Sequence, residues 1–160
     1  MTGVQTCALP IAYGFAAQAA LVEVSEATGQ VQVLKVASAH DVGRALNPLA
    51  AEGQIHGGIH MGLGYALSEE LRIEEGRVLN PQFMEYALLT AADMPEIVVH
   101  LIETVDEAGP FGAKGLGESG VIPVAAAVAN AVKDAVGVRL TELPMTPERV
   151  FRALGARPIS

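Results

Sequence analysis

The first third of the chain shows two runs of mostly alternating apolar and polar residues, separated by a short polar segment. Residues 17–24 form the first run, and residues 30–37 form the second, with its valines mostly on one side. A period of two is the spacing of side chains on one face of a strand. Residues 26–29 between the runs contain Gly29 and suit a turn, so the pattern predicts a β-hairpin. Residues 40–46 are predicted to form a loop.

A long helix is predicted to begin at Asn47-Pro48, because Asn is a favoured N-cap and Pro a favoured first helical residue. The pattern extends the helix to about Leu71. Each glycine inside a helix lowers its stability by about 1 kcal/mol relative to alanine. Some interaction must therefore offset the combined cost of the glycines in this helix. Either small residues pack closely against neighbours, or Gly53-Gln54 faces a bound heterocycle, to which an amide can donate and accept hydrogen bonds. Both explanations can hold. The glycines are Gly53, Gly57, Gly58, Gly62 and Gly64.

The second half of the chain predicts shorter elements. Apolar residues flank the turn at Glu75-Gly76 and indicate a short hairpin, and residues 81–95 are mixed, with a helical turn. Residues 96–105 indicate a strand, and residues 122–136 a helix. Thr146-Pro147-Glu148 begins a last short helix that ends near Leu154. The prediction is an α/β (α+β) fold in which hairpins and a mixed sheet pack with long helices.

Composition narrows the class of protein. The chain has 160 residues, which suits one domain, and 51% of them are hydrophobic. A net charge of −8 argues against a nucleic-acid or anionic-membrane partner. The most apolar stretch, residues 121–132, is shorter than the about 20 residues of a membrane span. Cys7 is the only cysteine, which excludes a disulfide framework and an iron–sulfur ligand set. We expect a cytoplasmic location, with the periplasm as the alternative.

Residues 112–120 are the most distinctive segment, because they place the single carboxylate of Glu118 among four glycines. Glycine lets a backbone approach a ligand closely, so such a turn can aim a carboxylate at a bound reactant. The structural alternative is that Glu118 caps the helix beginning near Val121, where a helix dipole favours a negative charge.

Two other readings of the sequence are weaker. The spacing of Gly115, Gly117 and Gly120 matches a dinucleotide-binding fingerprint, but such glycines directly follow a strand, and Glu118 would repel the pyrophosphate. A Rossmann-type nucleotide site is therefore a remote alternative. His56 and His60 have the i, i+4 spacing of metal ligands, but the sequence offers no third ligand nearby.

Seven motifs along the chain together carry a resemblance to a known family. They are residues 40–48, 52–58, 62–65, 79–81, 93–96, 109–118 and 143–149. The motifs occur in the family's order and span nearly all of residues 12–160. The chain resembles the C-terminal part of the large, molybdopterin-binding subunits of the xanthine dehydrogenase and aldehyde oxidase family, the molybdenum hydroxylases.

The resemblance implies a molybdenum ion held by a pterin cofactor, molybdopterin or its cytosine dinucleotide form, with no direct protein ligand to the metal. Glu118 matches the general base, which deprotonates an oxygen nucleophile that originates from water. Gln54, after Gly53, matches a residue that hydrogen-bonds the cofactor, and the backbone of residues Gly115, Leu116 and Gly117 is expected near the metal's ligands. Lys114 is assigned at most a supporting role, as the partner of a carboxylate. Where many relatives have Gln, this chain has His60 and Met61, so no amide contact is implied there.

The resemblance also implies partners and a reaction. The partners are the remainder of the large subunit, an iron–sulfur subunit and, in many members, an FAD subunit. The reaction is the oxidative hydroxylation of a small substrate, such as an aldehyde or an N-heteroaromatic compound. Because other parts of the subunit would supply most contacts, the isolated chain is expected to be inactive. The alternative is a non-catalytic structural or regulatory relative, which would have no need of the Glu118 carboxylate.

The N-terminus shows a different resemblance. Residues 1–11 lack the basic region and long apolar core of a signal peptide. They are similar to the in-frame translation of a common sequencing-adapter oligonucleotide. We therefore expect residues 1–11 to be non-native and residues 12–160 to be the C-terminal portion, a fragment, of a molybdopterin-binding domain.

Overall fold

The computed structural model describes residues 13–155, so the adapter-like segment lies outside the described residues. Three strands form the main sheet, a two-stranded hairpin stands apart, and three α-helices and two short 3-10 helices complete the fold. In chain order the elements are β1 (Ala16–Val24), β2 (Val31–Asp41), α1 (Pro48–Leu67), β3 (Ile73–Glu74), β4 (Arg77–Val78), η1 (Ala91–Asp93), β5 (Glu96–Ile102), η2 (Pro110–Gly112), α2 (Val124–Val136) and α3 (Pro147–Gly155).

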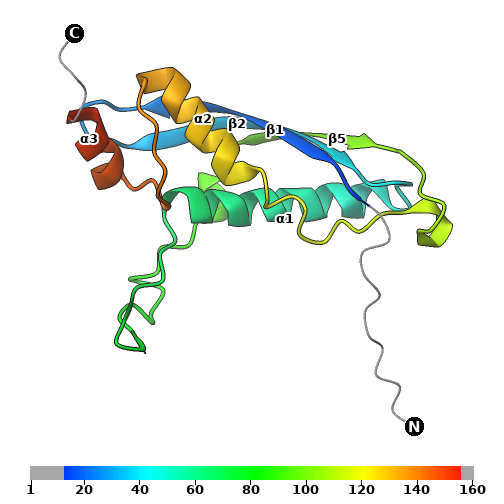
Figure 1. The fold of residues 1–160 in the computed structure, drawn as a ribbon, viewed down its shortest axis with the longest axis horizontal. Coiled ribbons are helices and arrows are strands. Elements are labelled where there is room, and N and C mark those ends of the chain that lie inside the picture. The colour runs from blue at the N-terminus through cyan, green and yellow to red at the C-terminus, as the bar shows by residue number, and fades with distance from the viewer. Residues whose placement is uncertain (1–12, 156–160) are drawn as a thin grey trace.

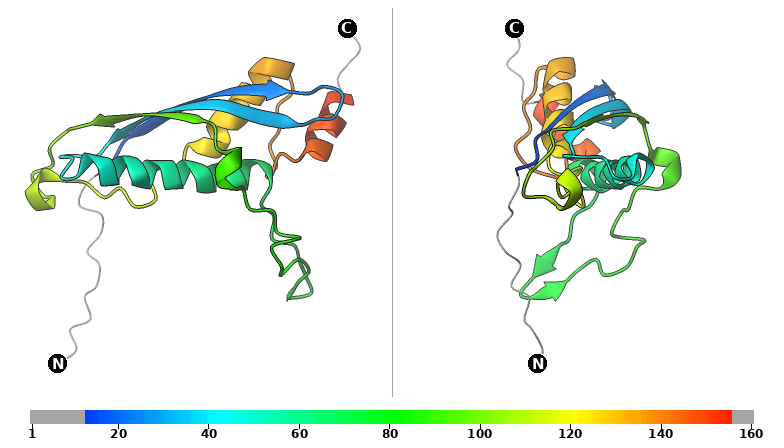
Figure 2. Two further views of the ribbon diagram at one scale, coloured as in Figure 1. Left: turned by 180° about the vertical axis from the view of Figure 1, so that it is seen from behind. Right: turned by 90° about the vertical axis from the view of Figure 1, so that its right-hand side faces the viewer.

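The main sheet is mixed, as the sequence predicts. Its order is β1-β2-β5, with β1 antiparallel and β5 parallel to the central strand β2. The predicted hairpin of residues 17–37 is confirmed as β1 and β2. Both long helices pack on one face of the sheet, and α1 runs along its length (Figure 1). Figure 2 shows the same two layers from behind and from one side.

The hydrophobic core lies between the sheet and the helices. The helix α2 buries valines at every fourth position, which places them on one stripe of a 3.6-residue helix. From α1, Ile55, Ile59 and Leu63 form the opposing stripe and are almost completely buried. Met145 and Val150 close the end of the core near α3. The α2 valines are Val124, Val128, Val132 and Val136.

Several predicted boundaries are wrong by a few residues. The predicted loop 40–46 begins too early, because His40 and Asp41 continue β2 by pairing with β5, a partner that lies far along the chain. The helix α1 begins as predicted, with the Asn47 side chain accepting from Ala50 N at 3.1 Å, but it ends at Leu67 rather than Leu71. The strand β5 ends at residue 102 rather than 105. The helix α2 begins at residue 124, after the N-cap residue 123.

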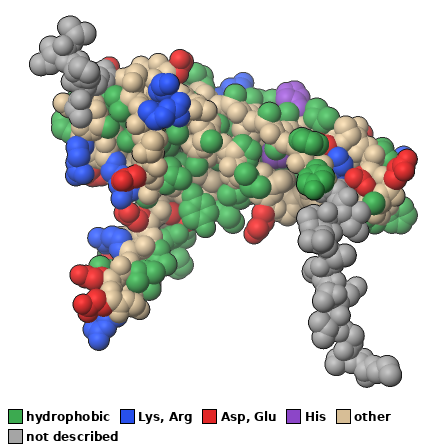
Figure 3. All heavy atoms as spheres, in the orientation of Figure 1, with side chains coloured by type: hydrophobic (Ala, Val, Ile, Leu, Met, Phe, Trp, Pro, Cys, Tyr) green, Lys and Arg blue, Asp and Glu red, His purple; other side chains and the backbone are tan. Residues whose placement is uncertain are grey.

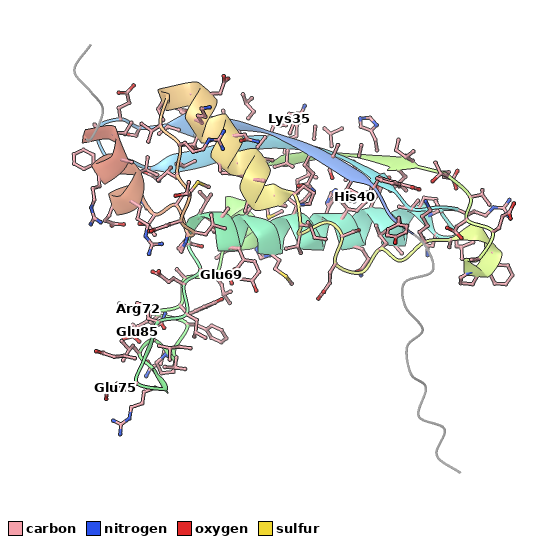
Figure 4. All side chains as sticks on the ribbon, viewed as in Figure 1. Lys35, His40, Glu69, Arg72, Glu75 and Glu85 are labelled. Atoms are coloured by element: carbon pink, nitrogen blue, oxygen red, sulfur yellow. The ribbon has the colours of Figure 1, made fainter. Side chains whose placement is uncertain are left out.

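Residues 69–88 form an arm that projects from the body of the molecule and carries the predicted hairpin β3–β4 (Figure 1). Buried Asn80 closes its base by accepting from Arg72 N at 2.9 Å and donating to Glu70 O at 2.7 Å. Glu75, labelled in Figure 4, lies at the tip of the arm. Charged side chains follow one edge of the arm and apolar ones the other in Figure 3. Within residues 13–155 no helix is both long and apolar enough to cross a membrane.

Candidate functional site

Residues 112–120, here called the glycine segment, lie directly on α1, with backbone against backbone. A Cβ added to Gly58 would come within 2.9 Å of the Gly120 backbone, and one added to Gly120 within 3.2 Å of the Ile55 Cα. A side chain at Gly58 would therefore force the two backbones apart, and one at Gly120 would be tighter than an ordinary contact. Gln54 precedes Gly58 by one helical turn, and Glu118 precedes Gly120 by two residues, so the contact brings together the two segments that carry the predicted functional residues.

A buried polar cluster holds the C-terminal end of the segment from the sheet side. The side chain of Gln18, on β1, donates from Nε2 to the Gly120 carbonyl oxygen at 3.0 Å. The same nitrogen lies 3.1 Å from Ser38 Oγ and 3.4 Å from His40 Nε2, both on β2. Ser38 and His40 are each only 1% exposed, and burial lowers the pKa of His40 below its usual 6.5.

A buried ion pair holds the N-terminal end of the segment. Lys114 Nζ lies 2.6 Å from Asp41 Oδ2, and the two side chains are 9% and 6% exposed. The ammonium also donates to Thr104 Oγ1 and to the Tyr13 carbonyl oxygen, each at 3.0 Å. The backbone joins in, since Lys114 N donates to Val42 O at 3.0 Å. The prediction that Lys114 pairs with a carboxylate is therefore confirmed.

Asp41 remains ionised over a wide pH range. Burial raises the pKa of its carboxyl group, but the hydrogen bonds with Lys114, Thr104 and the Gly43 N–H lower it by more than this. The positive charge of Lys114 lowers the pKa further. The result is a pKa of about 2, below the usual 3.8. Gly43 can donate from its N–H at 3.0 Å because its φ is +66°, which a residue with a Cβ rarely adopts.

Between these two anchors, the predicted cofactor-binding and catalytic residues face outward. The side chains of Glu118 and Gln54 are exposed, as are Gly115 and Gly117. A Cβ added to either of these glycines, or to Gly53 on α1, would meet no atom within 4 Å, so the backbone there is open to a ligand. Leu116 differs, because it is half-buried and packs against the core, so its side chain anchors the segment.

Two alternatives from the sequence do not fit this geometry. The residue that caps α2 is Pro123, with no side-chain cap hydrogen bond, so the helix-cap role for Glu118 is wrong. A Rossmann-type nucleotide site needs a parallel sheet with glycines directly after a strand. Here the sheet has one antiparallel pair, and residues 103–114 separate β5 from Gly115.

Four of the five glycines of α1 divide between the two explanations given for them. Gly58 and Gly62 pack closely, the latter against Val124, which accounts for them by packing. Gly53 and Gly57 face open space, so packing within this chain does not explain them. Gly53 and Gly57 lie one helical turn apart, so the helix backbone is exposed along this face of α1.

This division predicts opposite effects of two neighbouring substitutions. In this chain, Gly57→Ala should stabilise the fold by up to about 1 kcal/mol through helix propensity. Gly58→Ala should destabilise it, because the new methyl group would displace the Gly120 backbone. Urea unfolding of the two variants tests this. Equal shifts of the unfolding midpoint in both variants would contradict the close contact between Gly58 and Gly120.

The sequence did not identify the buried half of this site. Gln18 stands in the strand run 17–24, in which it looks like an ordinary alternating polar residue. Ser38 follows directly after the strand run 30–37, and Asp41 belongs to the predicted loop 40–46. The only available signal for Gln18 was a long amide side chain on the strand face that packs toward the helices. Glu118 and Gln54, by contrast, were identified from the sequence.

Comparison with known proteins gives the family to which this chain belongs. Residues 4–95 match the profile of the molybdopterin cofactor-binding domain. The chain belongs to this family. Its sequence is 44% identical over 124 residues to the xanthine dehydrogenase molybdenum-binding subunit of Escherichia coli O157:H7, covering 76% of the chain and 16% of that subunit. It is 43% identical over 139 residues to the nicotine 6-hydroxylase large subunit of Paenarthrobacter nicotinovorans, covering 84% and 17%.

Solved structures agree with the sequence comparison. The fold matches quinoline 2-oxidoreductase from Pseudomonas putida 86 with a TM-score of 0.83 and 38% identity, covering 88% of the chain and 18% of that structure. It matches aldehyde oxidoreductase from Desulfovibrio gigas with a TM-score of 0.82 and 34% identity, covering 89% and 16%. The chain therefore spans about a sixth of the length of these relatives.

Proposed function

We propose that this chain is the part of a molybdenum hydroxylase large subunit that supplies the general base, Glu118, and a cofactor contact, Gln54. The observation that carries the proposal is the exposed Glu118 carboxylate on a turn fixed at both ends, beside the open backbone of Gly115 and Gly117. The names of the relatives support the reaction class, because they include dehydrogenases, a hydroxylase and oxidoreductases.

The residues present fit a molybdenum–pterin cofactor. A flat heterocycle needs close approach to the backbone and groups that both donate and accept hydrogen bonds. Gly53, Gly115 and Gly117 admit such an approach, and the exposed Gln54 amide offers one acceptor and two donors. When bound, the cofactor supplies the two-electron oxidation and the Lewis-acid activation of water.

The proposed role of Glu118 is proton transfer. Its carboxylate accepts a proton from the water-derived oxygen that attacks the substrate carbon, an aldehyde or an N-heteroaromatic carbon. The two anchors of the glycine segment hold the backbone from which the Glu118 side chain extends.

Partners follow from the same proposal. The remainder of the large subunit would complete the cofactor and substrate contacts. The electrons must leave the site, and residues 12–160 contain no cysteine to ligate an iron–sulfur cluster. We therefore assign the iron–sulfur clusters and FAD to partner chains or to other domains.

The test is to express the complete subunit with its neighbouring subunits and to measure bound molybdenum and pterin. We expect roughly equimolar molybdenum, which Gln54→Leu should reduce about tenfold, as for losses of supporting contacts at metal sites. Gln82→Leu, on the exposed arm, is the matched control and should leave the molybdenum content unchanged. A well-folded, metal-free complex would instead favour a non-catalytic relative.

A further inference from the structure

We propose that Gln18 is a positioning residue for the glycine segment, and that its side-chain amide, by holding the Gly120 carbonyl, fixes the Glu118 carboxylate. The role rests on the proposed function of Glu118. The contact itself, between β1 and the turn before α2, joins residues 102 apart in sequence. It is thus a direct connection from the sheet to the turn that carries the predicted base.

The orientation of the Gln18 amide is fixed by its surroundings. A carbonyl oxygen can only accept, so the NH₂ group must face Gly120. Gly120 is buried, and within residues 13–155 no other side chain is seen to donate to its carbonyl. The second hydrogen of the NH₂ group is available to Ser38 Oγ or to His40 Nε2, and His40 Nε2 can accept it only when the imidazole is neutral with its proton on Nδ1. Burial favours this same neutral state, because it lowers the pKa of His40.

The other end of the amide indicates that stability is not the reason for this arrangement. Gln18 Oε1 is buried and has no hydrogen-bond partner among the described residues. A buried acceptor without a partner is destabilising, and native proteins seldom retain one without a function. An apolar side chain of the same size would fill the space without this unsatisfied oxygen. An apolar side chain could make none of the three contacts of the Gln18 nitrogen, and the bond to Gly120 is the only one of the three that reaches the glycine segment rather than β2.

The Gly120 bond controls Glu118 because the turn between them has little regular structure of its own. Within it, Val121 N donates to Glu118 O at 3.1 Å, and Ser119 Oγ to Leu116 O at 3.4 Å. On the N-terminal side, Lys114 is anchored by Asp41. Losing the Gln18 bond would remove the side-chain hydrogen bond to Gly120, leaving its backbone contact with α1 and the continuation of the chain into α2. Misplacing a catalytic group by about 1 Å can lower a rate about a hundredfold.

The experiment compares Gln18→Leu and Gln18→Glu in the complete subunit assembled with its partners. Leucine keeps the volume and removes the donor, whereas glutamate keeps the shape and turns a carboxylate toward the Gly120 carbonyl. Gln32→Leu, on the exposed side of β2, is the matched control. The measurements are kcat, KM, molybdenum content and amide hydrogen exchange of residues 115–121.

In both Gln18 variants we expect kcat to fall about 10- to 100-fold, with KM changed less than about twofold and molybdenum content unchanged. Exchange of residues 115–121 should become about tenfold faster, while exchange of β2 stays as in the wild type. Gln32→Leu should change none of these quantities.

Two results would overturn the proposal. One is Gln18→Leu with wild-type kcat and wild-type exchange in residues 115–121. The other is faster exchange spread over the whole sheet with loss of molybdenum, which would indicate a general structural role. Failure of the proposed function has a different signature, since Glu118→Gln would then keep normal turnover. The exchange data decide the role of Gln18 in either case.

Discussion

Glu118→Gln in the complete subunit is expected to lower kcat by about 10²- to 10⁴-fold, the usual contribution of a positioned general base. The amide keeps the size of the side chain but cannot accept the proton. Because Glu118 lies on the exposed side of the turn and not in the core, the fold should be unaffected. Steady-state turnover, normalised to bound molybdenum, measures the effect.

Glu107→Gln provides the matched control for this substitution. Glu107 is also exposed and lies between β5 and η2, shortly before the glycine segment in sequence, so it tests the effect of removing one exposed negative charge. Its turnover should stay within about twofold of the wild type. Normal turnover of Glu118→Gln at full molybdenum content would show that Glu118 is not the general base, and the proposed function would lose that residue.

Lys114→Met is expected to cost this chain about 3–5 kcal/mol of unfolding free energy, the usual result of leaving one member of a buried ion pair without its partner. Asp41 would keep a buried carboxylate whose strongest hydrogen bond is gone. The Thr104 and Tyr13 acceptors would lose the same donor. Urea unfolding followed by far-ultraviolet circular dichroism gives the free energy of unfolding.

The chain contains a suitable control in Lys35, which lies 2.7 Å from Glu96 at the sheet but on the surface, with side chains 41% and 64% exposed. Its position on the sheet is labelled in Figure 4. Lys35→Met should cost less than about 1 kcal/mol. Adding Asp41→Asn to Lys114→Met should recover part of the loss, since no buried charge then remains. Equal losses for Lys114→Met and Lys35→Met would show that burial does not decide the strength of these pairs.

Elements with local signals could be predicted from the sequence. The β1–β2 hairpin follows from alternation and a turn, and the start of α1 follows from Asn47 and Pro48. The parallel pairing of β2 with β5 could not be predicted, because the two strands are far apart in the sequence and no local pattern in either strand indicates which strand it pairs with. For the same reason the sequence placed His40 and Asp41 in a loop, although β5 holds both in a strand.

The candidate site divides in the same way. Its outward half was predicted, because a carboxylate among glycines and a Gln beside Gly53 are patterns of consecutive residues. Its buried half consists of contacts between distant segments, such as Gln18 with Gly120, which no local pattern encodes. The family membership is confirmed, whereas the roles of Glu118, Gln54 and the backbone of residues 115–117 stay predictions that the proposed variants test.

The two anchors of the glycine segment also set the order in which the site can form during synthesis. Asp41 is made 73 residues before Lys114, and Gln18 is made 102 residues before Gly120. On the ribosome, both early residues therefore wait for the donor or acceptor that completes them. The hairpin β1–β2 can form first, but the Glu118 turn gains its support only after translation has passed Gly120. A ligand that needs this turn can therefore be bound only after residue 120 has been synthesised.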